Sequence, residues 1–205
     1  QVFRCARKTG LVKEDTRLSF LGFGTMNGKD GKPFKTREGG VMRLENLIAD
    51  IDEEMFTKIV ENRSVRDKDA RDTAKIVGLA AIKYGDLSNQ ATKDYIFDVD
   101  RFTSFEGNTG PYILYTIVRI KSILNRYVEA GGNLEAGEIL PASNGSEKNL
   151  MLQLSGFGSM IESAFEEKAP HKICAYIYEV SNAFNSFYHE TKILSEENQA
   201  QKESY

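Results

Sequence analysis

The sequence predicts a mainly α-helical protein, in which a helical bundle follows a short segment with one β-strand and a basic loop. Three observations predict this class. Apolar residues recur at steps of three and four over much of residues 43–190, as they do on one face of a helix. Residues 17–23 show the polar and apolar alternation of a half-buried strand. Residues 25–40 are dense in glycine and lysine, which disfavours regular structure.

The N-terminal part should hold a short helix, the strand and the loop. Residues 1–9 look like the end of a helix that Gly10 stops. Residues 1–40 contain nine Lys/Arg and four Asp/Glu, a balance of +5, although the whole chain carries −3. A basic block on an acidic remainder indicates a localised contact with a polyanion. The alternative is a solvated face, which is what charge runs usually mark.

Two helices should follow the loop, over residues 43–62 and 67–84. Each has an apolar stripe at helical spacing. The first stripe is Leu44, Leu47, Ile48, Ile51, Met55, Ile59 and Val60, and the second is Ala70, Ala74, Val77, Ala81 and Tyr84. Residues 86–108 are expected to be irregular.

The next helix should run from about residue 110 to 127, with Thr109 as its cap and Pro111 in its first turn. Its apolar face is predicted as Ile113, Ile117, Ile120 and Leu124, and its opposite face as Tyr112, Tyr115, Arg119, Ser122 and Arg126. Aromatic rings that alternate with cations suit RNA, because unpaired bases stack on rings and arginines hold phosphates. The alternative is that the tyrosines edge the core and the arginines pair with acids.

Residues 128–146 hold four glycines and one proline, which predicts a loop. Helices are expected over residues 147–168 and 170–190, the second opened by Pro170. A stripe on the second predicts Cys174, Ile177, Val180, Phe184 and Phe187 in the core, with Asn185 and Tyr188 facing outward. The last dozen residues are polar and are expected to fray.

Several classes of protein are disfavoured. No apolar run approaches the roughly 18 residues of a membrane span, so we expect no membrane insertion. Cys5 and Cys174 lack the paired spacing of zinc or redox sites, which favours a reduced, cytoplasmic protein. His171 and His189 have no partner at metal-ligand spacing, so no metal site is expected. The chain does not open on Met, and we expect it to belong to a longer protein.

The basic loop carries Lys29, Lys32, Lys35 and Arg37 within nine positions, with glycines at both ends. Lysine ammonium groups on such a loop can follow a phosphate chain and neutralise charge as phosphate leaves. A hydroxyl at Thr36 can add a hydrogen bond. The alternative is a solvated hairpin tip whose lysines serve solubility.

Three segments resemble one known family. Lys32-Pro-Phe-Lys-Thr, after Leu21-Gly-Phe-Gly, is similar to the degenerate Lys-Met-Ser-Lys-Ser loop of arginyl-tRNA synthetases, which are class I aminoacyl-tRNA synthetases. Asp94-Tyr-Ile-Phe-Asp-Val-Asp-Arg and Ser104-Phe-Glu-Gly-Asn-Thr-Gly-Pro-Tyr resemble the run that joins the catalytic domain of this family to its anticodon-binding bundle. Ala183-Phe-Asn-Ser-Phe-Tyr-His resembles a helix of that bundle.

The resemblance implies an organisation. Residues 1–105 would be the C-terminal part of the catalytic domain, a small α/β remnant of a nucleotide-binding fold with the lysine loop at 28–40. Residues 106–205 would be the anticodon-binding helical bundle, which we expect to be truncated at its C-terminus. The class also needs a His-containing nucleotide motif, and no His occurs before His171. We therefore expect the isolated chain not to aminoacylate.

The resemblance also implies a function. The parent enzyme would be an arginine–tRNA ligase, joining L-arginine to its tRNA through arginyl-adenylate with ATP and Mg²⁺, none of them held tightly by this chain. Lys32, Lys35 and Thr36 would serve the ATP phosphates. The tRNA would be bound by Tyr112, Tyr115, Arg119, Arg126, Asn185 and Tyr188, in a monomer. The alternatives are a non-catalytic RNA-binding helical module and a helical protein-interaction domain.

Overall fold

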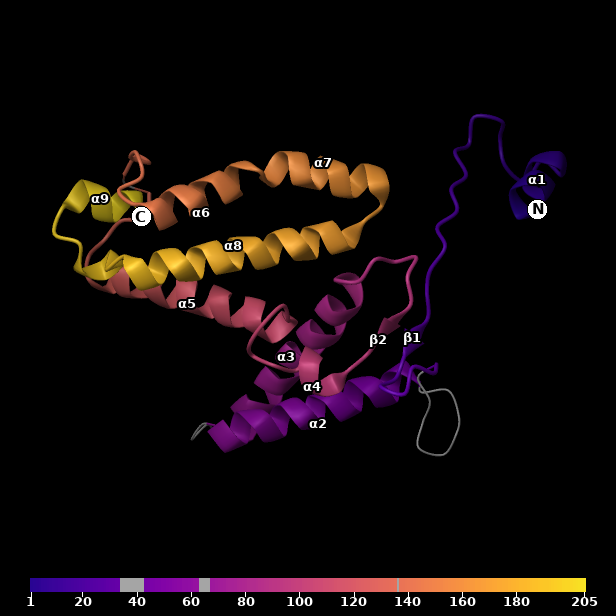
Figure 1. Ribbon diagram of the computed structural model, residues 1–205, viewed down its shortest axis with the longest axis horizontal. Helices are drawn as coiled ribbons and strands as arrows, with labels where there is room; N and C mark the ends of the chain where they lie inside the picture. Colours follow the sequence, from indigo (N-terminus) through magenta and orange to yellow (C-terminus); the bar gives the residue numbers. More distant parts are fainter. Residues whose placement is uncertain (34–42, 63–66, 136) are drawn as a thin grey trace.

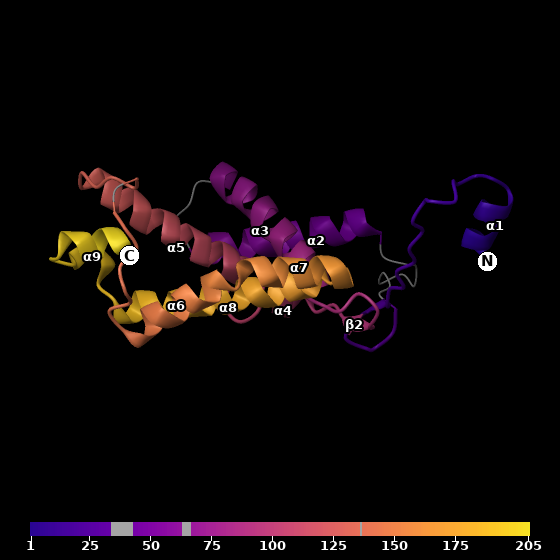
Figure 2. The ribbon, with the colours of Figure 1, turned by 90° about the horizontal axis from the view of Figure 1, so that it is seen from above.

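The computed structural model describes residues 1–33, 43–62, 67–135 and 137–205, and it is mainly helical as predicted. Helix α1 (Val2–Lys8) lies apart from the other elements at the end of an extended segment (Figure 1). Seen from above, the molecule is elongated, with α1 at one end and α9 (Gln199–Ser204) at the other (Figure 2).

Helices α2 (Leu44–Asn62) and α3 (Asp67–Leu87) form the first layer, close to their predicted bounds. The predicted stripes meet in one core, to which Phe97 and Phe102 add a ring pair with centroids 4.7 Å apart. The stripe of α2 is narrower than expected. Leu44, in the first turn, and Val60 are exposed, and Val60 lies about 100° around the helix from Ile59.

The predicted strand at 17–23 is wrong. The segment is extended, but within the described residues it has no neighbouring strand with which to form a hydrogen-bonded ladder. Phe20 and Phe23 are 83% and 89% exposed. The strand lies slightly later: β1 (Met26–Asn27) pairs in parallel with β2 (Tyr95–Ile96). Residues 86–108, predicted as irregular, therefore contain β2 and also the short helix α4 (Val99–Phe102).

The second layer is built on α8 (Pro170–Glu190), which lies between α5 (Gly110–Glu129) on one side and α6 (Gly145–Ser155) with α7 (Phe157–Glu167) on the other (Figure 1). The predicted cap of α5 is confirmed, since Thr109 Oγ1 accepts a hydrogen bond from the Tyr112 N–H at 3.2 Å. The single helix predicted over 147–168 is wrong. It breaks at Gly156, a residue that weakens a helix interior because it has no side chain.

The predicted apolar face of α5 is wrong in part, since Ile113 and Ile120 are half-buried but the other two residues are exposed. Thr116 is 3% exposed, whereas Ile117 is 42% exposed and Leu124 is exposed too. The face that packs on α8 carries Tyr112 and Thr116 instead. Its polar atoms are satisfied there by amides of α8, and such satisfaction is what allows polar side chains to be buried.

The C-terminal residues do not fray as predicted. They form a 3₁₀ turn, η1 (Ile193–Ser195), and α9, which Asn198 caps. The Tyr205 ring packs edge-on against Phe187 of α8 at 5.4 Å. The Ser204 hydroxyl accepts a hydrogen bond from the Leu140 N–H at 2.8 Å. The C-terminal segment thus closes one end of the second layer. None of the helices in the described residues combines the length and apolarity needed to cross a membrane.

Candidate nucleic-acid interface

A groove of about 550 Å³ lies between the second half of α5 and the end of α8. We refer to it as the α5–α8 groove. Its lining residues are Tyr115, Val118, Arg119, Ser122, Ile123 and Arg126 of α5, Tyr188 and His189 of α8, and Thr191, Lys192, Ile193, Leu194 and Ser195 of the segment that follows α8. The groove is therefore formed by two helices, α5 and α8, that are far apart in the sequence.

Arg119 is held between two aromatic rings of the groove. Its guanidinium carbon lies 4.8 Å from the ring centroid of Tyr115 and 5.2 Å from that of Tyr188. Both distances fall in the range of cation–π attraction. The two rings are also partly exposed. The arrangement places two partly exposed aromatic rings beside a fixed cation, and such rings and cations are the groups that contact unpaired bases and their phosphates.

An amide network behind the groove fixes Arg119. Its Nη1 donates to Oδ1 of Asn185 at 2.5 Å, and Nδ2 of Asn185 donates to the Tyr112 hydroxyl at 2.8 Å. That hydroxyl in turn donates to Oδ1 of Asn182 at 2.8 Å. Asn185 and the Tyr112 hydroxyl each accept one hydrogen bond and donate another, so the network sets the direction of the guanidinium as well as its place.

The groove is cationic although the chain is acidic. Arg119, Arg126 and Lys192 line it together with His189, and no Asp or Glu is among its lining residues. The sequence did not predict Lys192 and His189 as site residues, although His189 ends the segment that resembles a helix of the bundle. Their position just after an aromatic helix face was a usable signal, but only the turn after α8 shows that they reach the groove.

The predicted tRNA-binding residues divide into two groups. Tyr115, Arg119, Arg126 and Tyr188 line the groove. Tyr112 and Asn185 lie behind it and hydrogen-bond to each other, so Asn185 faces α5 rather than outward. The structure therefore favours RNA contact for the first group and support for the second, and both roles stay predictions.

The described part of the second predicted site, the lysine loop for the ATP phosphates, lies near the layer formed by α2 and α3. Lys32, the first lysine of the predicted phosphate loop, is exposed at the end of a tight turn. Lys35 and Thr36 lie outside the described residues. Lys29 contacts two carboxylates, with its Nζ 3.0 Å from Oδ1 of Asp98 and 2.7 Å from Oδ2 of Asp100. Across the described ranges, no group of three or more His, Cys, Asp or Glu side chains could hold a metal ion.

Two family models match the chain. The catalytic domain of class I tRNA synthetases (R) matches residues 1–99, and the DALR anticodon binding domain matches residues 113–204. The groove lies in the second match and the Lys29–Asp98 pair in the first.

Individual proteins similar to this chain are arginine–tRNA ligases. The arginine–tRNA ligase of Agathobacter rectalis is 67% identical over 213 residues, covering 100% of this chain and 36% of the relative. That of Alkaliphilus oremlandii is 57% identical, covering 100% and 35%. The chain thus spans about a third of the length of these curated relatives.

Solved structures show the same fold. The arginyl-tRNA synthetase of Plasmodium falciparum superposes with a TM-score of 0.76 at 25% identity, over 98% of this chain and 34% of that one. The fold of the Thermus thermophilus arginyl-tRNA synthetase also matches, with a TM-score of 0.75 over 89% and 30% of the two chains. With its class I catalytic segment followed by a DALR domain, and with relatives this similar over its whole length, the chain belongs to the arginyl-tRNA synthetase family.

Proposed function

We propose that the chain is part of an arginine–tRNA ligase and that its α5–α8 groove binds the anticodon loop of arginine tRNA. The observation that carries this proposal is the fixed cation at Arg119 between the rings of Tyr115 and Tyr188. Anticodon bases are single-stranded and can leave their stack, and single-stranded bases are what aromatic side chains capture. Arg126 and Lys192, which also line the groove, would neutralise the adjoining phosphates.

In the whole ligase, the turn that carries Lys32 would face the phosphate chain of ATP while L-arginine is activated. An ammonium group there can stabilise the charge that develops on the leaving pyrophosphate. Mg²⁺ would arrive with ATP, since ATP phosphates are its usual ligands. The boundary between the two functional parts would lie near residue 105, between α4 and α5. The match of residues 1–99 to the class I catalytic domain, with Lys32 inside it, supports this function over a purely RNA-binding module.

The test is a titration of the purified chain with labelled arginine tRNA at two salt concentrations, beside the same tRNA with a changed anticodon. We expect tighter binding to the unaltered anticodon, weaker at higher salt but still selective, because phosphate contacts alone carry no sequence information. Equal affinity for the two tRNAs would contradict the proposed function of the groove.

A further inference from the structure

Lys29 and its two carboxylate partners are brought together by the parallel pairing of β1 and β2. The register joins Met26 to Tyr95 and Asn27 to Ile96. Lys29 follows the end of β1 by two residues, and Asp98 follows the end of β2 by two residues, so the pairing of the strands brings both residues to the same end of the sheet. The Nζ atom is 3.0 Å from Oδ1 of Asp98 and 2.7 Å from Oδ2 of Asp100.

The same turn fixes the position of Lys32. The Gly28 N–H donates to the Lys32 carbonyl at 2.8 Å, and the Gly31 N–H donates to the Gly28 carbonyl at 2.9 Å. Gly31 has a φ of 71°, a left-handed conformation that glycine adopts without strain. The Lys32 N–H donates to Oδ1 of Asp30 at 3.1 Å. Lys29 and Lys32 thus belong to one tight turn, so holding the first constrains the second.

The extended segment before β1 is anchored to the residues that precede β2. The Thr25 N–H donates to Oδ1 of Asp94 at 2.6 Å, and the Gly24 N–H donates to the Ala91 carbonyl at 2.8 Å. A Cβ atom at Gly24 would lie 2.2 Å from the Lys93 carbonyl carbon, so only glycine allows this approach. The turn is therefore held at two places: by these backbone contacts before β1, and by Lys29 after it.

We propose that Lys29 is a positioning residue that, through Asp98 and Asp100, fixes the turn presenting Lys32 to the phosphate chain of ATP. This inference rests on the proposed function of the lysine loop. The proposal gives different roles to two lysines of the same basic loop. Lys32 is the phosphate-facing cation, and Lys29 acts through it.

The charges around Lys29 favour this division. The hydrogen bonds that Lys29 donates to the carboxylates of Asp100 and Asp98 raise the pKa of Lys29 above its ordinary value, so the group stays charged beside its partners. To reach a phosphate, its ammonium would have to leave both carboxylates. The side chains are well exposed, 58% for Lys29 and 74% for Asp100, and exposed pairs add little to global stability. Loss of the pair should therefore disturb the local turn and leave the folded state intact.

The first test uses hydrogen exchange of the chain itself, followed by NMR. The variants are Lys29→Met, the double change Asp98→Asn with Asp100→Asn, and the triple combination. Asparagine keeps the helix-capping ability of Asp98, which begins α4. Lys83→Met, at an exposed lysine of α3, is the matched control.

We expect exchange of the Gly28 amide to quicken roughly threefold in the first two variants and no further in the triple one, because an exposed ion pair contributes little and all three variants release the same contact. The exchange rate of Gly28 should not change in the control, and the melting temperature should not change in any variant. An unchanged Gly28 amide in both variants would overturn the proposal.

The second test places residues 1–205 in the matching stretch of the Agathobacter rectalis ligase and measures ATP–pyrophosphate exchange. In the Lys29→Met and Asp98→Asn/Asp100→Asn variants we expect kcat to fall roughly tenfold, with KM for ATP within about twofold, because misplacement of a catalytic group costs rate. A rise in KM for ATP on changing Lys29, with no effect of the aspartates, would mean that Lys29 binds phosphate directly and would overturn the proposal. An inactive unsubstituted chimera would contradict the proposed function, and the exchange rate of Gly28 would still decide the positioning role.

Discussion

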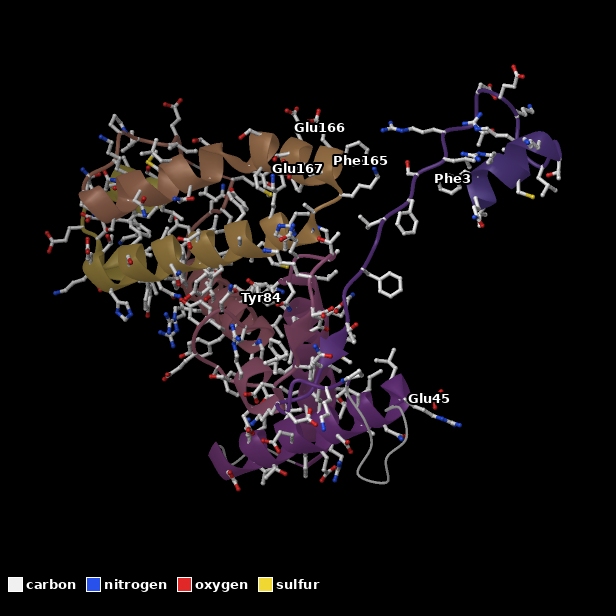
Figure 3. The ribbon with its side chains drawn as sticks, turned by 45° about the vertical axis from the view of Figure 1, so that its right-hand side comes forward. Phe3, Glu45, Tyr84, Phe165, Glu166 and Glu167 are labelled. Carbon is white, nitrogen blue, oxygen red and sulfur yellow. The ribbon has the colours of Figure 1, made fainter. Side chains whose placement is uncertain are left out.

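The hydroxyl oxygen of Tyr84, on α3, lies 2.8 Å from the main-chain carbonyl oxygen of Cys174, on α8. The same hydroxyl oxygen is 2.6 Å from Oδ1 of Asn108, in the segment before α5. Figure 3 shows Tyr84 near the centre of the molecule, where the two layers meet. One side chain thus joins the layer that carries Lys32 to the layer that carries the groove.

Replacing this hydroxyl should loosen the contact between the layers. For Tyr84→Phe we expect the free energy of unfolding in urea to fall by about 1 kcal/mol, the usual net worth of such a hydrogen bond. Tyr127→Phe is the matched control, since the buried hydroxyl of Tyr127 has no hydrogen-bond partner in the described part of the chain. Its loss should cost nothing. Equal losses in the two variants would show that the Tyr84 contact does not stabilise the fold.

The approach of α5 to α3 depends on Gly110. A Cβ atom there would lie 2.3 Å from the carbonyl oxygen of Ala80. We expect Gly110→Ala to lower the free energy of unfolding by about 2 kcal/mol, because the helix backbones must move apart. Gly158→Ala, in α7, is the control. Nothing lies within 4 Å of its Cβ position, so alanine should be neutral or stabilising there. Circular dichroism during urea unfolding measures both.

The two thiols should differ in reactivity. Cys5 is exposed and Cys174 is buried, and burial raises the pKa of the Cys174 thiol. Because the thiolate is the reactive form, Cys174 should be alkylated only as α8 opens. At pH 8 a thiol reagent should label one site quickly in the folded chain and two after unfolding. Rapid labelling of both sites in the folded chain would contradict the packing of α8.

The cationic wall of the groove can be tested through salt dependence. We expect Arg126→Ala and Lys192→Ala each to weaken binding of arginine tRNA and to reduce the slope of log affinity against log salt by roughly 0.7, the value per phosphate contact of a single strand. Lys121→Ala is the control, because Lys121 is an exposed cation of α5 that does not line the groove. A similar effect of Lys121 would indicate only diffuse attraction.

The helices could be predicted from local patterns, because a helix that buries one face has apolar residues at every third or fourth position of the sequence. The stripe of α2 and the cap of α5 at Thr109 are examples. Which face of α5 is buried could not be predicted in this way. The polar atoms of its buried face, on Tyr112 and Thr116, form hydrogen bonds with Asn182 and Asn185, some seventy positions away. A side chain that looks solvent-facing can be buried once a distant amide meets it. The prediction of a strand at 17–23 was wrong for a related reason. A strand needs a neighbouring strand for its hydrogen bonds, and an alternation of polar and apolar residues does not show whether such a neighbour is present.

The site was predicted in part. Tyr115, Arg119, Arg126 and Tyr188 were chosen from helix faces and a family resemblance, and the structure gathers them in one groove. Lys192 and the positioning contacts of Lys29 depend on a turn and on a strand register, neither of which has a local signal. The roles of Lys35 and Thr36, the domain boundary, the Mg²⁺ requirement, the monomeric state and the cytoplasmic location stay predictions.

We propose that the anticodon loop of arginine tRNA binds in the α5–α8 groove. A direct test measures the affinity of the unsubstituted chain and of Tyr188→Ala for arginine tRNA and for the same tRNA with a changed anticodon, at one salt concentration. Loss of one stacking ring should cost about 1–3 kcal/mol of binding to the unaltered tRNA. Because stacking accepts any base, binding of the changed tRNA should weaken by a similar amount. If Tyr188→Ala binds the unaltered tRNA as tightly as the unsubstituted chain does, the groove does not hold the anticodon loop and the proposed function is wrong.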